Sequence, residues 1–390
     1  MSAAAANESH LDPERTRELF EASTDFTIGL EEEFAIVDPG TLELQQRFED
    51  LFAACQEDEV LAESACGELI ASEIEIRSGR AESFAEAVDL QGERRARLFG
   101  LAAELGLGLA STGTHPWADY LDQRIIDTPH YRRLEEELRW VAHRNNTWSL
   151  HVHVGVRGAD RAVAVCDHLR GVLPILLAVS ANSPFLDGRD TGLHSVRTEI
   201  FTRTFPRCGV HEPFGSWEAY ADFVDLLVRT SSIVEATQLW WSIRPHHTFG
   251  TVELRICDAQ TRGDESFGLA ALIAACIAQS ALDFDAGRLS QPLRQREIEE
   301  NLWRAIRHGM DGRMIDFERR TEIPSREAVG QLLEWTAPAR DLLGLDPRIP
   351  DPNGAQRALR SLTHGASVEE IYREAVAETR RTYAPERVSC

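Results

Sequence analysis

The sequence contains no lysine, so all 41 of its basic residues are arginine. This absence excludes a Schiff-base lysine, the lysine of a phosphate-binding P-loop and the active-site lysine of protein kinases. Any phosphate that the protein recognises must therefore be held by arginine, by backbone amides or by a metal ion.

The chain is also poor in positive charge overall. It has 64 Asp and Glu residues against 41 basic ones, a net charge of −23. This excess argues against a nucleic-acid partner, because such binding needs cations that face the phosphates. It also predicts a requirement for cations wherever carboxylates cluster.

Signals for export or membrane insertion are absent from the sequence. The first residues lack the hydrophobic region of a signal peptide. The longest apolar runs, 171–181 and 268–278, are shorter than the roughly 20 residues of a membrane span. Seven cysteines without CxxC spacing form neither a disulfide framework nor a zinc ribbon. We therefore expect a cytoplasmic protein with reduced thiols and no membrane partner.

Hydrophobic periodicity predicts an α+β fold. We expect a flexible leader over residues 1–24 and a single domain over 25–390, mostly helical from about residue 295. The predicted strands alternate in the manner typical of antiparallel sheets with one buried face. The expected architecture is a curved antiparallel sheet, with helices packed on one face and an open, carboxylate-lined face on the other.

Four predicted strands, 26–37, 69–77, 149–156 and 249–257, carry ionisable residues on one side. Side chains alternate between the two faces of a strand, so aliphatic residues point one way and charged ones the other. Glu32 falls on the apolar side, which requires a bulge, an edge position or a charged partner. The outward positions are Glu31, Glu33, Glu73, Glu75, Arg77, His151, His153, Glu253 and Arg255.

A charged outer face is common on a single strand, so only the four strands taken together indicate a functional face. Two carboxylates at positions i and i+2 lie about 6.6 Å apart and repel by roughly 2.5 kcal/mol at an effective dielectric of about 20. Such a cluster is stable only with cations between the carboxylates or with raised pKa values. Oxygen ligands with an imidazole suit Mg²⁺ or Mn²⁺ better than zinc.

A zinc hydrolase is the alternative interpretation of the HxH pair formed by His151 and His153. Such a site usually has further histidine ligands, which His115 or the pair His246–His247 could supply. The excess of carboxylates weighs against this alternative.

Two segments outside the strands hold candidate ligand-binding residues. Loop 180–210 is either a solvated surface loop or a segment in which arginines bind a substrate carboxylate; Asn182, Arg197 and Arg203 are the candidates. In the predicted helix 300–311, Asn301 and Arg304 share a face. They either belong to an ion-paired surface helix or contact a nucleotide.

Seven motifs occur in order along the chain and together resemble the type 2 glutamate–cysteine ligase family, in particular its bacterial carboxylate–amine ligase branch. That family is similar in turn to glutamine synthetase, whose sheet carries ExE, HxH and ExR strands in the same order. The motifs are GLEEEFAIVDP (29–39), SEIEIRSG (72–79), STGTHP (111–116), SLHVHVGV (149–156), SANSPFLDGRDTGLHSVRTEIF (180–201), WSIRPHHTFGTVELRICDAQT (241–261) and ENLWRAIRHGMDG (300–312).

The resemblance implies an ATP-dependent ligase that works through an acyl phosphate, with Mg²⁺ or Mn²⁺ as cofactor and ATP as a substrate. L-Glutamate and L-cysteine are the family's default pair, so the expected partners are small molecules. A member that binds nucleotide without turnover stays open as an alternative, and so does a homodimer. Replacing Glu31 or Glu253 by Gln is expected to abolish ADP formation and leave the fold intact or slightly stabilised.

The resemblance also implies roles for individual residues. Arg255 is expected at the transferring phosphoryl group and the nucleotide, and Arg197 at the reacting substrate. Glu68 is included among the ligands because related ligases place a carboxylate seven residues before the position of Glu75. It needs a bulge or a non-strand start, and Glu73 is its competitor. The expected metal ligands are Glu31, Glu33, Glu68, Glu75, His151 and Glu253; the substrate contacts are Arg197, Arg203, His153 and Asn182; the nucleotide contacts are Arg255, Arg304 and Asn301.

Overall fold

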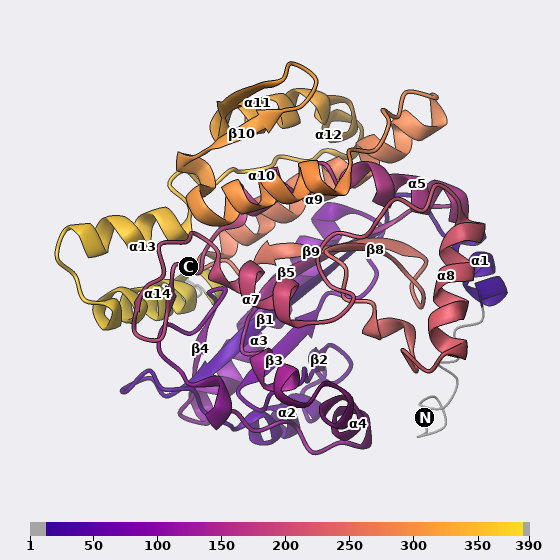
Figure 1. Ribbon diagram of the computed structural model, residues 1–390. Helices are drawn as coiled ribbons and strands as arrows, with labels where there is room; N and C mark the ends of the chain where they lie inside the picture. Colours follow the sequence, from indigo (N-terminus) through magenta and orange to yellow (C-terminus); the bar gives the residue numbers. More distant parts are fainter. Residues whose placement is uncertain (1–12, 385–390) are drawn as a thin grey trace.

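The centre of the protein is an antiparallel sheet that is not closed on itself (Figure 1). The computed structural model describes residues 13–384. The four predicted strands are present, although the second begins only at Glu73. The sheet order is β2 (Ala65–Cys66), β3 (Glu73–Arg77), β1 (Ile28–Val37), β5 (Ser149–Gly155), β9 (Thr251–Asp258) and β8 (Ile243–His246), with β4 (Gly108–Ala110) paired to β1.

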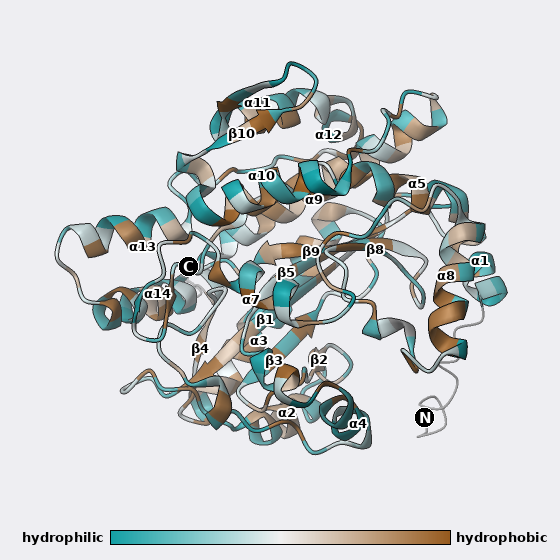
Figure 2. Cartoon of the chain, in the orientation of Figure 1, coloured by the Kyte–Doolittle hydropathy of each residue, from teal (hydrophilic) through white to brown (hydrophobic). Residues whose placement is uncertain are grey.

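Helices cover one face of this sheet. α5 (Ala159–Leu169), α6 (Leu173–Ser180) and α9 (Gly263–Asp285) pack against β5, β8 and β9. α3 (Phe84–Glu104) packs against β1 and β3. The aliphatic side of each strand enters these contacts, and hydrophobic residues gather along β9 and α9 (Figure 2). The predicted fold class is therefore confirmed.

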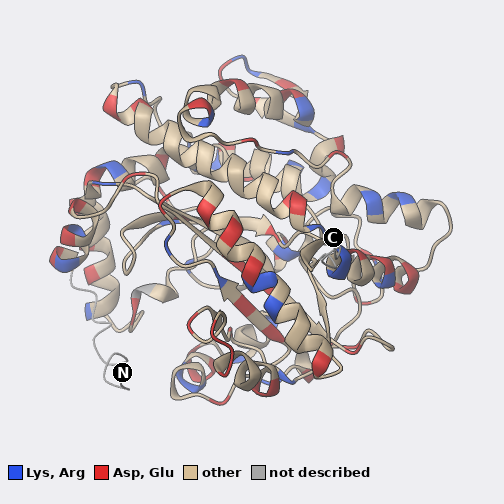
Figure 3. Ribbon diagram, turned by 180° about the vertical axis from the view of Figure 1, so that it is seen from behind, with Lys and Arg blue, Asp and Glu red and all other residues tan. Residues whose placement is uncertain are grey.

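α9 is the core helix of the fold. Among residues 13–384 it is the one unbroken helix long and apolar enough to cross a membrane, and 83% of its apolar window is buried inside the protein. The bent pair α5 and α6, with an angle of 63°, passes the same test only if it is counted as one span. Charged residues of α9 lie only near its two ends (Figure 3). The buried window is that of a helix packed inside a folded core.

The remaining helices surround this centre. Part of the expected leader is helical, because α1 (Pro13–Glu21) is formed there and buries Phe20 in the core; residues 1–12 of that leader lie outside the described part. From residue 295 to 384 the chain is mostly helical and includes the hairpin β10 (Arg313–Asp316) and β11 (Thr321–Pro324). The other helices are α2 (Phe48–Gln56), α4 (Pro129–Leu138), α7 (Val196–Thr204), α8 (Trp217–Arg229), α10 (Gln295–His308), α11 (Ser325–Trp335), α12 (Ala337–Leu343), α13 (Gly354–Thr363) and α14 (Val368–Tyr383).

A charged partner explains Glu32 on the helix-covered side of β1. Arg95 of α3 donates to both carboxylate oxygens, at 2.6 and 2.5 Å, and both side chains are buried. Gln91 and Ser266 donate to the same carboxylate, at 3.1 and 2.5 Å. Four hydrogen bonds thus compensate the desolvation of this charge inside the core.

Candidate metal and substrate site

Strand register brings the predicted ionisable residues onto one face. Glu31 of β1 lies opposite Arg77 of β3 on one side and opposite His151 of β5 on the other. His153 pairs with Glu253 of β9. Residues directly opposite each other in an antiparallel pair point to the same side of the sheet. The cluster that alternation predicted within each strand is therefore continuous across them.

This face is covered, so that it forms the floor of a cavity and not an exposed surface. The covering segments are α4, α7 and residues 235–249, and they enclose about 410 Å³. The floor carries carboxylates, histidines and arginines. The wall has an apolar part, formed by Tyr131, Leu138, Phe201, Phe205 and Trp240, and a polar part that includes His130, Glu235 and Gln238. The site is thus a polar floor under a wall that is partly hydrophobic.

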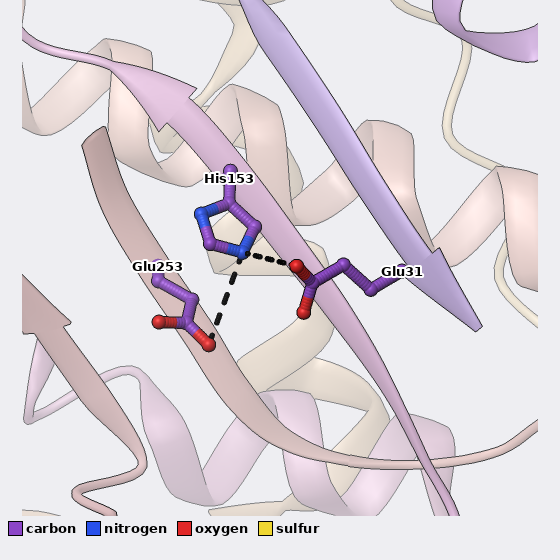
Figure 4. Close-up of side chains that lie close together, drawn as sticks. All are labelled: Glu31, His153 and Glu253. Atoms are coloured by element: carbon purple, nitrogen blue, oxygen red, sulfur yellow. Dashed lines mark ion pairs between the residues drawn. The ribbon is translucent and has the colours of Figure 1, made fainter. Parts of the chain in front are cut away.

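Two groups of three residues on the floor could each hold a metal ion, and they share Glu31. In each group the potential ligand atoms lie within 4.8 Å of one another. In the first, Nε2 of His153 lies 3.3 Å from Glu31 and 3.9 Å from Glu253 (Figure 4). The second group comprises Glu31, Glu75 and His151.

The donor set fits a divalent cation. His153 is oriented by Thr251, whose hydroxyl lies 3.0 Å from Nδ1. Its Nε2 is buried, points at two carboxylates and makes no hydrogen bond within residues 13–384. A buried imidazole held in this way, beside carboxylate oxygens, is the usual arrangement of a metal-binding histidine. The carboxylate-rich mixture suits Mg²⁺ or Mn²⁺.

At the β9 end of the floor, cations balance the carboxylates. Glu253 accepts hydrogen bonds from Arg244 (2.7 Å to Nε) and from Arg255. Burial would raise the pKa of Glu253, but these two arginines and His153 hold it well below its ordinary value. Burial is likewise outweighed at Glu31, where the neighbouring histidines and Arg77 lower the pKa. Both carboxylates are therefore charged at neutral pH.

At the β3 end, carboxylates face one another. Burial, reinforced by neighbouring glutamates, raises the pKa of Glu68 and Glu73 well above the ordinary value. Burial also raises the pKa of Glu75, although Arg77 opposes the shift with Nε 2.5 Å from the carboxylate. Glu33 accepts from Ser149 at 2.5 and 2.7 Å, yet burial raises its pKa as well. Arg77 faces several carboxylates at this end, which is therefore short of positive charge.

Glu68 and Glu73 differ in their access to the cavity. Glu68 lies between β2 and β3, the non-strand start that its assignment requires, and lines the cavity. Glu73 lies opposite Ala35, outside the cavity lining, and neither of its oxygens has a hydrogen-bond partner within residues 13–384. The geometry places Glu68, and not Glu73, within reach of a bound ligand.

A β-bulge in β9 reshapes the far end of the floor. Between Leu150 and Val152 the register shifts, so that Arg255 and Ile256 together face one residue of β5. Arg197 of α7 donates to the carbonyls of these two residues, Ile256 at 3.0 Å and Arg255 at 3.3 Å. Both Arg197 and Arg255 line the cavity.

Four predicted residues do not reach the cavity. Arg203 is 58% exposed and lies 3.7 Å from Glu199. Arg304 pairs with Glu300 and Glu322 on the surface, and Asn301 exchanges two hydrogen bonds with Ile315 that fix the hairpin β10–β11 to α10.

Asn182 is the fourth of these residues. It belongs to a different cavity of about 710 Å³, and its amide donates to Ala259 and Thr261 at 2.7 and 3.1 Å. Asn301 and Asn182 thus have structural partners of their own.

The histidines that a zinc hydrolase would need as ligands do not lie together in the structure. His246 joins the cavity, with its ring 5.1 Å from that of His153. His247 bonds to Tyr220, and His115 bonds to the carbonyl of Leu42 at 2.8 Å in another part of the fold. A metal centre built from all of these histidines does not form.

Sequence reasoning did not assign three charged residues near the floor: Arg77, Arg244 and Asp258. Alternation had placed Arg77 on the outward face but gave it no role. Strand 243–246 was not recognised; with that strand, alternation with period two would also have placed Arg244 beside Glu253. Asp258 reaches the cavity side of β9 only because of the bulge, since it lies opposite Ser149. No local sequence signal reveals that shift.

Two solved structures share the fold. The chain is similar to glutamate–cysteine ligase from Francisella tularensis in complex with AMP (TM-score 0.67, 11% identity, 94% of this chain and 91% of that one). It is also similar to a bifunctional glutathione synthetase from Pasteurella multocida (TM-score 0.69, 12% identity, 95% of this chain) and spans 54% of that protein. The fold is therefore that of this class of ligases.

Sequence comparison identifies the family. Residues 27–379 match the family model of glutamate–cysteine ligase family 2. The chain is 40% identical over 357 residues, 91% of each chain, to "Putative glutamate--cysteine ligase 2-2" of Rubrobacter xylanophilus. It is 40% identical over 344 residues to a similarly named protein of Sorangium cellulosum, covering 88% of this chain and 90% of that one. The chain belongs to glutamate–cysteine ligase family 2, as its motifs predicted, and the comparisons give the hydrolase alternative no support.

Proposed function

We propose that the protein is an ATP- and Mg²⁺-dependent ligase that joins a carboxylate to an amine, with L-glutamate and L-cysteine as the favoured pair. The observation that carries this proposal is the convergence of two metal-binding groups and Arg255 on one cavity floor. In the proposed reaction a substrate carboxylate attacks the γ-phosphate of ATP, and ADP leaves. The amine then displaces phosphate, loses a proton and forms the amide.

The carboxylate floor would hold the cations. Glu31, His153 and Glu253 would bind one ion, and Glu31, Glu75 and His151 a second, with Glu33 and Glu68 nearby. When bound, Mg²⁺ or Mn²⁺ would supply the positive charge that lets a triphosphate approach this acidic surface. His153 therefore serves better as a metal ligand than as a substrate contact.

Arg255 is suited to bind the transferring phosphoryl group. Its Nη1 is anchored on Glu253, and its Nε is buried without a hydrogen-bond partner within residues 13–384. A fixed guanidinium stabilises the charge that develops on phosphoryl oxygens. The chain offers no lysine that could take over this role.

The apolar part of the wall would protect the acyl phosphate from water. Phe201, Phe205 and Trp240 form a contiguous aromatic surface, with ring centroids 4.7 Å apart for the first pair and 5.9 Å for the second. Excluding water prevents hydrolysis of a reactive intermediate before the amine arrives.

Release of ADP tests the proposal directly. The purified protein is incubated with Mg²⁺-ATP and L-glutamate, with and without a panel of amines that includes L-cysteine. We expect release that depends on both the carboxylate and the amine. A folded protein that binds ATP and releases no ADP with any pair would support a nucleotide-binding member without turnover and contradict the proposed activity.

A further inference from the structure

Asp258 is the centre of a buried polar cluster beside the candidate site. The residue is 0% exposed. Its Oδ2 accepts hydrogen bonds from the backbone N–H of Asn182 (2.8 Å) and from the hydroxyl of Ser183 (2.7 Å). Its Oδ1 accepts from the hydroxyl of Ser195 (2.9 Å) and lies 3.8 Å from Nη1 of Arg197. Three hydrogen bonds and one cation thus compensate the buried carboxylate.

The cluster fixes the first turn of α7. Ser195 is the N-cap of this helix and accepts from the N–H of Thr198 at 3.3 Å. Ser183 accepts from the backbone N–H of Arg197 at 3.2 Å. Asp258 therefore accepts hydrogen bonds from both hydroxyls, those of Ser183 and Ser195, that in turn accept from backbone N–H groups at the start of α7. It connects β9 to the helix from which Arg197 and the wall residue Phe201 project.

The space around the carboxylate is filled. A Cβ atom at Gly113 would lie 2.8 Å from Oδ2 of Asp258 and 2.9 Å from Cβ of Ser183. Contacts this short do not occur in folded proteins, so no side chain fits at position 113 and the backbone there packs directly against the carboxylate. This close packing restricts the movement of Asp258.

Arg197 retains a donor for a ligand. Its Nη1 and Nη2 each bond to a carbonyl of the bulge, while its Nε is buried without a partner within residues 13–384. The residue is 4% exposed and lines the cavity. Nη1 and Nη2 each carry a second N–H, so the guanidinium can still donate to a ligand carboxylate in the cavity.

We propose that Asp258 is a positioning residue that holds Arg197 and the first turn of α7 in place, so that Arg197 can bind the carboxylate group of the amino-acid substrate. The inference rests on the proposed function for the identity of that ligand. Asp258 itself does not touch the substrate. It acts through charge on the guanidinium and through hydrogen bonds to Ser183 and Ser195.

Steady-state kinetics of four variants test this proposal: Asp258→Asn, Arg197→Gln, their double variant and Asp167→Asn. Asp167 is the matched control, because it is another buried aspartate that accepts backbone hydrogen bonds, from Phe214 and Gly215, and it lies outside the cavity lining. Asp258→Asn should raise the KM for the carboxylate substrate by about tenfold or more and leave the KM for ATP within about twofold.

The double variant decides whether Asp258 acts through Arg197. Its KM for the carboxylate substrate should be no higher than that of Arg197→Gln alone, since both changes remove the same function. Effects that multiply in the double variant, or an Asp258→Asn profile equal to that of Asp167→Asn, would overturn the proposal. Ser195→Ala removes the hydroxyl that donates to Asp258 and accepts from the N–H of Thr198, and it keeps the carboxylate. It should raise the same KM severalfold, and it replaces Asp258→Asn if that variant does not fold.

Hydrogen–deuterium exchange separates this inference from the ligase activity. Asp258→Asn should speed exchange of the amides in the first turn of α7, in particular those of Arg197 and Thr198, whereas Asp167→Asn should not. Unchanged exchange in folded Asp258→Asn would overturn the positioning role even if the enzyme is a ligase. If the protein shows no ligase activity but Asp258→Asn exchanges faster, the proposed substrate of Arg197 is wrong, while the role of Asp258 in anchoring α7 is supported.

Discussion

The two ends of the cavity floor contain the same residue types and balance their charge in opposite ways. At the β9 end, Glu253 lies between Arg244 and Arg255 and keeps a lowered pKa. At the β3 end, Glu68 on the floor and Glu73 just outside the cavity lining lie among other carboxylates and have raised pKa values. Alternation within a strand decides which face a glutamate occupies, but its partners across the strands decide whether it is charged.

The difference predicts which end depends on a metal ion. The β9 end carries its own arginines, so its carboxylates are stable as charged groups without added cations. The β3 end is short of positive charge, which a divalent cation would supply. Glu31 lies between the two ends and belongs to both of the groups that could hold a metal ion.

The largest expected effect is the loss of activity in Glu31→Gln. Because this residue is shared by both groups, its replacement should reduce ADP release by about a thousandfold or more. Circular dichroism should show an unchanged fold. A variant that retains activity within about tenfold of the wild type would show that the two groups do not act together.

The second effect is a loss of stability in Glu253→Gln. Repulsion alone predicts that this change leaves the fold intact or slightly stabilised. At the β9 end, however, the change would leave Arg244 and Arg255 buried without their carboxylate. We expect the free energy of unfolding to fall by about 3 kcal/mol or more. Urea unfolding measures this; Glu369→Gln, a change in a surface pair, should alter it by less than about 1 kcal/mol.

The third prediction concerns pH. The pKa of Glu73 is raised in the folded protein, so the folded state keeps a proton that the unfolded chain loses above pH 4.5. The contribution of Glu73 to the free energy of unfolding of the metal-free protein should therefore fall as pH rises from about 4.5 through the raised pKa, by up to about 1.4 kcal/mol per pH unit. Urea unfolding of the wild type and of Glu73→Gln over this range tests the sign, because the difference between the two proteins cancels the buried histidines, whose lowered pKa values act in the opposite direction. A wild type that gains stability relative to Glu73→Gln as pH rises would contradict the raised pKa.

The smallest expected effect is a gain in stability in Glu73→Gln. This carboxyl lies among Glu33, Glu68 and Glu75 and has no hydrogen-bond partner within residues 13–384. A neutral amide of the same size removes the cost of holding the proton but also buries unpaired polar atoms, so the net gain in stability of the metal-free protein should be about 1 kcal/mol above neutral pH. Thermal unfolding at matched pH gives the comparison. A loss comparable to that of Glu253→Gln would show that the two ends do not differ.

Much of the floor could be predicted because its signal is local. Period-two alternation depends only on neighbouring residues, and it identified the faces of Glu31, Glu75, His151, His153 and Glu253. The family motifs added Glu68. The charged partner of Glu32 was required by its position, although its identity depended on a helix more than 60 residues away in sequence.

The rest depended on tertiary structure. Asp258 changes face because of a bulge that no residue pattern announces, and Arg244 belongs to a short strand that was not recognised. Arg203, Arg304 and Asn301 carry plausible functional groups, but only the fold determines how far they lie from the floor. A charged residue in a loop or on a helix shows which ligand group it could bind, but its place in the sequence does not show how far it lies from the cavity floor.

Binding of Mn²⁺ tests the central claim most directly, because electron paramagnetic resonance detects the free ion without any assumption about substrates. Titration of the wild type, Glu31→Gln and the control Glu369→Gln compares their dissociation constants. We predict saturable binding by the wild type and by the control, with a loss of at least about tenfold in Glu31→Gln. Equal binding by all three proteins would contradict the assignment of this floor as a metal site.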